Sequence, residues 1–301
     1  FTKPFLTATD IGFSLTPQIN ALGRLEDARD GVTFLIGDDE ARVEHIGKVL
    51  KELNEARRLI ERKIFSEVEE QILTGKIDLS NDRIIIASSN NWQPGVIGLV
   101  ASRLVGAYNR PTILLSVTSQ SIAKGSCRSV PGFNMFEALS EFKELLTSFG
   151  GHAQAAGLAL PLEKLPDLKR GLERVMREKI PTFSEKATLS IDAEVRLDEV
   201  HKKLLADLGN LEPFGNENAP PKFYLQDVSL LEAPKLLKES HTKCMLFKEG
   251  TIKPVIFFNR PELFEILSQQ ADKPFSLIVQ ATENHFNGKV SAELHGVDIA
   301  L

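Results

Sequence analysis

The sequence predicts an α/β region preceded by a long connecting helix and followed by a small β-barrel. Three patterns predict it: apolar residues recur at three- and four-residue steps over residues 38–75, apolar strands flank a helix over residues 83–117, and strand-like runs dominate after residue 188. With 301 residues, the chain exceeds what one hydrophobic core usually organises, so we expect two or three domains.

Composition narrows the class of protein. The chain is 42% hydrophobic and 26% charged, with a mean hydropathy of -0.10, which is typical of a soluble globular protein. Its most apolar stretch, residues 95–107, is interrupted by Ser102 and Arg103 and is shorter than the ~20 residues that a bilayer requires. Cys127 and Cys244 cannot build a disulfide framework, so we expect a reducing compartment, the cytoplasm.

Residues 38–75 are predicted to form one amphipathic helix. Asp38 and Asp39 stand at its start and Gly75 follows its end, which is the boundary chemistry that helices favour. About 35 residues exceed the usual length of a globular helix, and helices of this length often connect domains. The apolar stripe consists of Val43, Ile46, Leu50, Leu53, Ile60, Ile64, Val68 and Ile72.

The α/β region begins with an apolar strand at residues 83–87. A loop, a helix through Ile97 and Leu104, and a second strand at residues 112–117 follow. Strand, helix and strand in this order predict parallel pairing with a crossover. Two more helices are expected, one capped by Asn134 and running to about Ser148 and one over residues 165–179.

The β-rich region contains five predicted strands, over residues 222–231, 242–248, 253–258, 275–282 and 290–299. Asn287-Gly288 joins the last two strands and is a strong hairpin signal. Five strands with helical segments at residues 198–208 and 261–270 fit a barrel of the OB type, and a sandwich is the alternative. The aromatic residues here are expected in the core rather than as stacking platforms: Tyr224, Phe247, Phe257, Phe258 and Phe286.

Charge bears on nucleic-acid binding in two opposite ways. The net charge of -5 disfavours a general attraction for phosphate. Between residues 235 and 260, however, six basic residues stand against two acidic ones, which leaves room for a local basic surface. The basic residues are Lys235, Lys238, Lys243, Lys248, Lys253 and Arg260.

Three motifs could bind an anion. In residues 124–129, Gly125, Ser126 and Arg128 offer backbone N–H groups, a hydroxyl and a bidentate guanidinium; the alternative is a strand entering a turn with a solvated arginine. In residues 149–157, Gly150 and Gly151 would let backbone approach a ligand beside His152, although a lone histidine in a glycine turn is often structural. Arg24 could reach an anion or bridge local carbonyls.

A metal site cannot be assembled from local spacing. The six histidines are scattered, and no C-x-x-C or H-x-x-x-H occurs. Phosphate-loop, dinucleotide and nucleophile-elbow motifs are also absent. On its own residues, the chain is therefore a poor candidate for catalysis.

Five motifs in order together resemble the RecJ family of single-stranded-DNA exonucleases, within the DHH phosphoesterase superfamily. They are residues 19–25, 92–104, 124–129, 150–157 and 211–215, and the similarity covers nearly the whole chain. The chain departs from the family pattern at Gln93, where histidine is common, and at Cys127, where glycine or another small residue is common.

The resemblance implies a domain order. Residues 1–37 would be the end of the DHH phosphoesterase domain, and residues 38–75 would be the helix that connects it to the next domain. Residues 76–182 would form the DHH-associated domain, and residues 183–301 would form an OB-like nucleic-acid-binding domain. The Mn²⁺ or Mg²⁺ ligands of such enzymes precede the connecting helix, and nothing here matches them. We therefore expect that this chain binds no metal and is inactive alone.

The resemblance also implies site residues and a function. Ser126 and Arg128, with Gly125, would hold the DNA 5′-phosphate; Arg24 and His152, beside Gly150 and Gly151, would line the catalytic cleft. The implied activity is 5′-to-3′ exonuclease action in DNA repair and recombination, with a single-stranded-DNA-binding protein and a helicase as partners. The alternatives are a non-catalytic replication or repair scaffold and a short-RNA phosphodiesterase.

Overall fold

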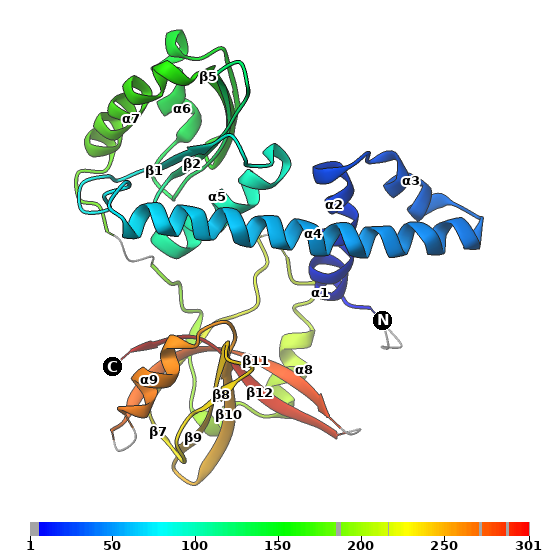
Figure 1. The fold of residues 1–301 in the computed structure, drawn as a ribbon. Helices are drawn as coiled ribbons and strands as arrows, with labels where there is room; N and C mark the ends of the chain where they lie inside the picture. Colours follow the sequence, from blue (N-terminus) through cyan, green and yellow to red (C-terminus); the bar gives the residue numbers. More distant parts are fainter. Residues whose placement is uncertain (1–5, 185–187, 216, 271–272, 287–288, 301) are drawn as a thin grey trace. The chain divides into compact units, whose positions relative to one another are not determined.

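A computed structural model describes residues 6–184, 188–215, 217–270, 273–286 and 289–300, without the side chains of residues 284–290. The chain divides into two compact units (Figure 1). One consists of Ile11–Ala187, and the other of Phe1–Asp10 with Thr188–Leu301. Within the described residues, every helix is too short or too polar to cross a lipid bilayer.

Residues 8–73 are mainly helical. Their elements are α1 (Ala8–Asp10), the π-helical turn η1 (Ile11–Leu15), α2 (Thr16–Leu25), α3 (Arg29–Ile36) and α4 (Glu40–Leu73). α4 is the long helix that the sequence predicts over residues 38–75, and Asp39 caps it by accepting a hydrogen bond from the backbone N–H of Arg42 at 3.1 Å. α2 packs on α4 through a small core that includes Leu22, Ile46 and Leu50.

The α/β part is built on a five-stranded sheet with the order β1-β2-β3-β5-β4. The strands are β1 (Ile85–Ser89), β2 (Thr112–Val117), β3 (Ile122–Arg128), β4 (Ser148–Gly151) and β5 (Ala155–Pro161). β1 and β2 are parallel and are connected by α5 (Pro94–Tyr108), as the sequence predicts. The remaining pairs are antiparallel.

Helices cover both faces of this sheet. α4 and α5 share one core with the sheet, and α6 (Met135–Ser140) and α7 (Leu165–Lys179) share the other. Two 3-10 turns complete this part, η2 (Lys143–Leu145) and η3 (Leu162–Lys164). The expected extension of α6 to about Ser148 is wrong, because Thr147 already donates its backbone N–H to Ala159 and starts the edge of the sheet.

The C-terminal part is a closed barrel. Its elements are β6 (Ala193–Glu194), η4 (Leu197–Glu199), α8 (Lys202–Gly209), β7 (Phe223–Leu230), β8 (Lys235–Leu237), β9 (His241–Lys248), β10 (Thr251–Phe257), α9 (Glu262–Ser268), β11 (Phe275–Phe286) and β12 (Lys289–Ala300). The strands β7-β11-β12-β10-β9 form one sheet, and pairing of β7 with β9 closes it.

This closure confirms the OB-type barrel over the sandwich. β10 and β12 pair in parallel and all other barrel pairs are antiparallel, and α9 lies between β10 and β11 in the chain. β11 and β12 pair as the predicted hairpin, while the turn residues Asn287 and Gly288 lie outside the described residues.

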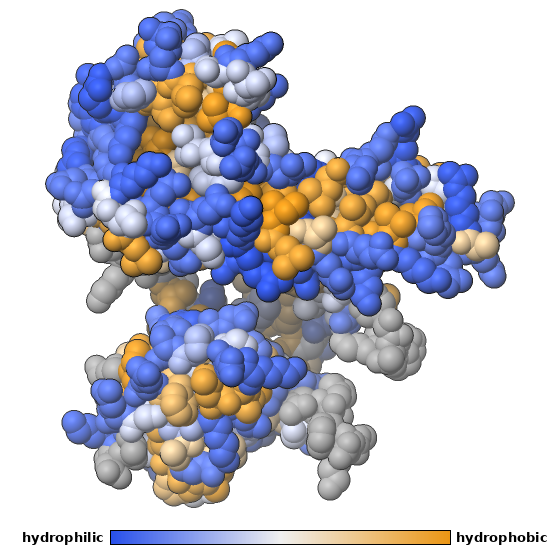
Figure 2. Space-filling view, in the orientation of Figure 1, coloured by the Kyte–Doolittle hydropathy of each residue, from blue (hydrophilic) through white to orange (hydrophobic). Residues whose placement is uncertain are grey.

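Apolar side chains remain exposed on the helical part. Figure 2 shows apolar surface gathered over α2, α3 and α4. In α3, Val32, Leu35 and Ile36 are 57%, 63% and 78% exposed. Contiguous apolar surface of this kind usually marks a protein contact.

Both cysteine thiols are buried in hydrophobic cores and should therefore be unreactive in the folded chain. Burial raises the pKa of Cys127 to about 12, against a smaller opposing effect of Arg128, and burial raises the pKa of Cys244 to about 12 as well. Because the thiolate is the reactive species, neither cysteine should react with Ellman's reagent at pH 8 in the folded chain, and both should react in urea. Fast labelling of either thiol under native conditions would contradict the burial.

Candidate nucleic-acid interface

β3 presents two of the predicted site residues on one face of the sheet. Side chains alternate along a strand, and here Ala123 and Cys127 point into the core that α6 and α7 cover. Ser126 and Arg128 are half-buried on the opposite face, which carries α5. The strand therefore brings a hydroxyl and a guanidinium together two residues apart.

The backbone of β3 is not available to a ligand. β3 is a central strand, and Ser126 is in register with Leu114 of β2 on one side and with Gly157 of β5 on the other. The expectation that residues 124–129 offer free backbone N–H groups to an anion is therefore wrong. Gly125 serves packing, because a Cβ there would lie 2.8 Å from Cδ2 of Leu115.

Arg128 is held by neighbours rather than simply solvated. Its Nε donates to Oγ of Ser102 at 3.0 Å, and its Nη1 donates to Oγ of Ser126 at 3.0 Å and to the carbonyl of Cys127 at 2.7 Å. These bonds fix the planar guanidinium between a helix and a strand. A guanidinium beside two hydroxyls can bind an anion that has several oxygens.

Arg24 reaches the same helix from α2. Its Nη1 donates to the carbonyl of Gly95 at 3.0 Å, and a Cβ on Gly95 would lie 2.2 Å from the carbonyl oxygen of Arg24. Gly95, Gly98 and Ser102 share one face of α5, since they are three and seven residues apart. Arg24 and Arg128 therefore approach one helix face within two turns.

Gly98 is the point of closest approach on that face. A Cβ at Gly98 would lie 2.8 Å from Oγ of Ser126 and 3.1 Å from Nη2 of Arg128. A side chain at Gly98 would therefore force the Ser126 hydroxyl to shift and would crowd the Arg128 guanidinium. Gly98 belongs to the motif of residues 92–104, and its spacing in the sequence does not reveal this close approach.

The environment of Arg24 is electropositive. Burial lowers the pKa of the Arg24 guanidinium, and the positive charges of Arg57 and Arg128 lower it further, whereas Glu61 raises it. Arg57 and Glu61 belong to α4 and were missed by sequence reasoning. The available signal was the break in the apolar stripe between Leu53 and Ile60, which holds Arg57.

His152 follows the end of β4 and is exposed. Its backbone N–H donates to the carbonyl of Ala155, and Ala155 is in register with Arg128. Neighbouring strands lie about 4.8 Å apart, so His152 and Arg128 stand at the same end of the sheet, roughly 10 Å apart.

The two glycines before His152 differ. Gly151 has a φ of +138° and its Cβ would lie 2.4 Å from the carbonyl oxygen of Ala155, so the hairpin itself requires glycine. At Gly150 a Cβ would meet nothing within 4 Å. Gly150 therefore leaves an open backbone surface, where a ligand could approach closely.

The residues at the start of α5 tie the helix in place. The indole N–H of Trp92 donates to Glu67 of α4 at 2.6 Å, and the carbonyl of Trp92 accepts from Ser116 of β2 at 2.8 Å. Gln93 is the N-cap residue, and its side chain makes no capping hydrogen bond. Trp92 is thus structural, and Gln93 is exposed beside the site.

The outer face of the barrel carries exposed aromatic rings. Phe247 and Ile252 are cross-strand partners on β9 and β10 and are 39% and 45% exposed. Phe258 is 47% exposed and packs edge-on against His241 and His295, at centroid distances of 5.3 and 4.9 Å.

Only some of the aromatic residues that were expected in the core are buried. The expectation is wrong for Phe247 and Phe258, which lie on the outer face of the barrel. Phe247 belongs to β9, and Phe258 directly follows β10. It is confirmed for Phe257, which is fully buried, whereas Tyr224 is half-buried. The side chain of Phe286 lies outside the described residues.

Several of the basic residues of this region are occupied. Lys235 pairs with Glu232 at 2.8 Å, and Lys248 donates to the carbonyl of Gln226 at 2.6 Å. Arg260 contacts Glu262 and, at 3.4 Å, Asp298. Lys238, which is exposed, and Lys243, which is half-buried on the same face of β9 as Phe247, are therefore better candidates for contacts to a polyanion. Lys253 is in register with the buried Leu246 and lies on the opposite face of the sheet.

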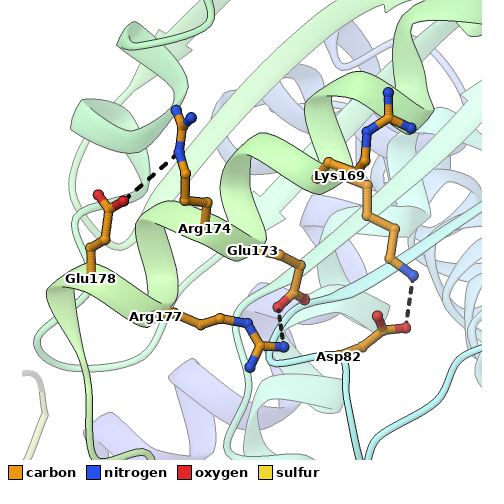
Figure 3. Close-up of a pocket in the computed structure, with 7 residues that line it drawn as sticks. Asp82, Lys169, Glu173, Arg174, Arg177 and Glu178 are labelled. Carbon is orange, nitrogen blue, oxygen red and sulfur yellow. Dashed lines mark hydrogen bonds and ion pairs between the residues drawn. The ribbon is translucent and has the colours of Figure 1, made fainter.

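A second group of basic side chains, on α7, is structural. Figure 3 shows Lys169 beside Asp82, Arg177 beside Glu173 and Arg174 beside Glu178, at 2.7, 3.7 and 3.9 Å. Glu173 also accepts the backbone N–H groups of residues 83 and 84, ahead of β1. These cations are neutralised locally, unlike Arg24 and Arg128, which donate to carbonyl and hydroxyl oxygens rather than to carboxylates.

The part of the chain that the structure describes offers no group of three or more His, Cys, Asp or Glu side chains able to hold a metal ion. The residues present therefore do not fit a divalent-metal centre, and we derive no step through one.

Comparison with known proteins agrees with this architecture. Residues 81–178 match the family described as the DHHA1 domain, and residues 191–298 match the family described as the RecJ OB domain. The single-stranded-DNA-specific exonuclease RecJ of Bacillus subtilis is 30% identical over 293 residues, which are 97% of this chain and 37% of that protein. RecJ of Escherichia coli is 29% identical over 81% of this chain and 43% of its own length.

Solved structures of RecJ are also similar to this chain. RecJ of Thermus thermophilus in complex with Mn²⁺ matches 98% of this chain and 42% of its own chain, with 26% identity and a TM-score of 0.80. The Mg²⁺ complex of the same protein gives the same score. The chain thus spans less than half the length of these relatives, and with its DHHA1 and OB domains it belongs to the RecJ family.

Proposed function

We propose that this chain binds the 5′-phosphorylated end of single-stranded DNA for a metal-dependent 5′-to-3′ exonuclease of DNA repair and recombination. One observation carries the proposal: Arg24 and Arg128, with Ser126 and Ser102, converge on one face of α5. Guanidinium forks match the geometry of phosphate oxygens. A terminal phosphate presents three such oxygens and more negative charge than an internal one.

The barrel would hold single-stranded DNA. Phe247 and Phe258 are exposed rings on which bases could stack, and Lys243 lies on the same face of β9 as Phe247. OB folds commonly bind oligonucleotides on the second and third strands of the barrel, here β9 and β10. The names of the relatives, single-stranded-DNA-specific exonucleases, support the same substrate.

We also propose the domain limits that the sequence suggested. Residues 1–37 would end a phosphoesterase domain, which the exposed apolar residues of α3 support. Residues 38–75 would connect, residues 76–182 would form the DHH-associated domain, and residues 183–301 would form the OB-like domain; the family matches at 81–178 and 191–298 support the last two.

Catalysis would depend on groups outside the described residues. The Thermus thermophilus relatives are solved with Mn²⁺ and Mg²⁺, and a divalent metal supplies a nucleophilic water when bound in such enzymes. His152 and Arg24 would line the cleft in which bond cleavage occurs, and Gly150 would let the strand approach the sheet. A cytoplasmic location, a single-stranded-DNA-binding protein and a helicase remain predictions.

The decisive test is Arg128→Ala. Loss of its charged hydrogen bonds should weaken binding of a 5′-phosphorylated oligo(dT) by about 1.5–3 kcal/mol and leave binding of the 5′-hydroxyl strand nearly unchanged. Fluorescence anisotropy of the 301-residue chain with 3′-labelled strands measures both affinities. Equal losses for the two strands would overturn the role of Arg128 at the terminus.

Gly98→Ala tests the same site without removing a donor. The added methyl must shift the Ser126 hydroxyl and crowd the Arg128 guanidinium, so the preference for the 5′-phosphorylated strand should fall. The matched control is Gly106→Ala in the same helix, where a Cβ meets nothing within 4 Å. The control should keep the preference and gain up to about 1 kcal/mol of stability. Full preference in Gly98→Ala would contradict the proposed geometry.

The chain by itself is expected to bind DNA without cutting it in Mn²⁺, since the described residues offer no ligand group for the metal. A 5′-phosphorylated strand with a 3′ label should stay at full length on a denaturing gel under conditions in which anisotropy detects binding. Shortening of the strand that disappears in His152→Ala would show that the chain carries its own active centre.

A further inference from the structure

A groove lies on the barrel beside α8, and the proposed function does not use it. α8 packs against β11 and β12, and residues of these three elements line a cavity of about 550 Å³, together with Phe214 and Pro220 from the loop after α8. All the residues that line it belong to one compact unit. Concave sites of this size commonly bind ligands. We call this cavity the α8 groove.

Hydrogen bonds from side chains shape the loop that lines the α8 groove. The amide nitrogen of Asn218 donates to the carbonyl oxygens of Leu211 and Pro213, at 2.9 Å each. The amide nitrogen of Gln280, on β11, donates to the carbonyl oxygen of Pro220 at 3.0 Å and ties the loop to the barrel. The wall that carries Phe214 is therefore formed before a ligand binds, which lowers the entropic cost of binding.

The α8 groove combines apolar side chains with hydrogen-bond acceptors. Leu208 and Phe214 are half-buried in its wall. Gln280 and His295 also line it and are cross-strand partners on β11 and β12. Burial lowers the pKa of His295, against a smaller opposing effect of Glu293, so the ring is neutral at pH 7 and can accept a hydrogen bond. A ligand with an apolar part and hydrogen-bond donors fits this combination.

The charge of the α8 groove is negative, unlike that of the basic segment of the same barrel. Glu212 and Glu283 line the groove and are exposed, and the described residues that line it include no lysine or arginine. The basic side chains of residues 235–260 lie elsewhere, because no residue of that range lines the groove. Carboxylates repel phosphate groups, so the groove disfavours a nucleic acid and favours a cation.

We propose that the α8 groove binds a basic, partly apolar segment of a partner protein. An aliphatic side chain of the segment packs on Leu208 and Phe214, and a lysine or arginine pairs with Glu212 and donates to the acceptors of the groove. Charge complementarity selects this kind of partner and orients it. The barrel then holds two ligands of opposite charge at separate places, a polyanion on its basic segment and a cationic protein segment beside α8.

The test uses a short rhodamine-labelled peptide in which leucine alternates with lysine and arginine. Fluorescence anisotropy should detect its binding to the 301-residue chain, and a matched peptide with glutamate at each basic position should not bind. Glu212→Gln should weaken the basic peptide roughly twofold to fivefold, as loss of one exposed ion pair allows. The matched control is Glu217→Gln, an exposed carboxylate of the same loop that does not line the groove, which should leave the affinity unchanged.

A second variant fills the groove without changing its charge. Gly209, the last residue of α8, lines the groove, and a Cβ there would meet nothing within 4 Å. Gly209→Leu should weaken the basic peptide by on the order of tenfold, because the new side chain takes the space of the apolar anchor. Gly106→Leu in α5, at an equally open position away from the barrel, should have no effect. If Gly209→Leu does not fold, the exposed Glu212 and Glu217 variants decide alone.

Two results would overturn the proposal. Equal losses in Glu212→Gln and Glu217→Gln would show that the peptide follows the net charge of -5 and not the groove. Single-stranded DNA is the competing occupant, so binding of labelled oligo(dT) is measured on the same variants. If Gly209→Leu weakens oligo(dT) and leaves the basic peptide unchanged, the groove belongs to DNA. The proposal expects the reverse, a loss for the peptide and an unchanged affinity for oligo(dT).

Discussion

The candidate site depends on two glycines, Gly95 and Gly98, on one face of α5. Gly95 lets the end of α2 come so close that a Cβ would overlap the carbonyl of Arg24, and Gly98 does the same for Ser126 and Arg128. Glycine inside a helix costs roughly 0.5–1 kcal/mol relative to alanine. The helix accepts this cost, and two arginines from distant parts of the chain meet on it as a result.

Because side chains alternate along a strand, β3 contributes to the hydrophobic core on one face of the sheet and to the candidate site on the other. On β3, Cys127 lies in the hydrophobic core while Ser126 and Arg128 face the helix with the glycines. Since β3 has a paired strand on each side, its backbone is fully engaged and only its side chains can bind a ligand. The same alternation on β9 buries Cys244 and leaves Phe247 exposed.

Pairing distinguishes structural charges from those available to a ligand. On α7 the cations have carboxylate partners within 4 Å, and the group anchors the chain ahead of β1. In the candidate site, Arg24 and Arg128 donate to carbonyl and hydroxyl oxygens rather than to carboxylates. Like charges gathered in a partly buried place are unfavourable until an anion arrives, which makes this cluster better suited than α7 to bind a phosphate.

The sequence by itself determined the long helix, the parallel β1-α5-β2 unit, α7 and the five barrel strands, because periodicity, caps and turn residues are local signals. Its motifs also predicted Arg24, Ser126, Arg128 and His152 as site residues, and that assignment stays a prediction. It did not identify β4 and β5 as a hairpin, because glycine-rich strands carry no apolar alternation. Only the tertiary structure joined Arg24 to α5 and turned Phe247 and Phe258 outward. Those features depend on contacts between residues far apart in the chain, which no local pattern records.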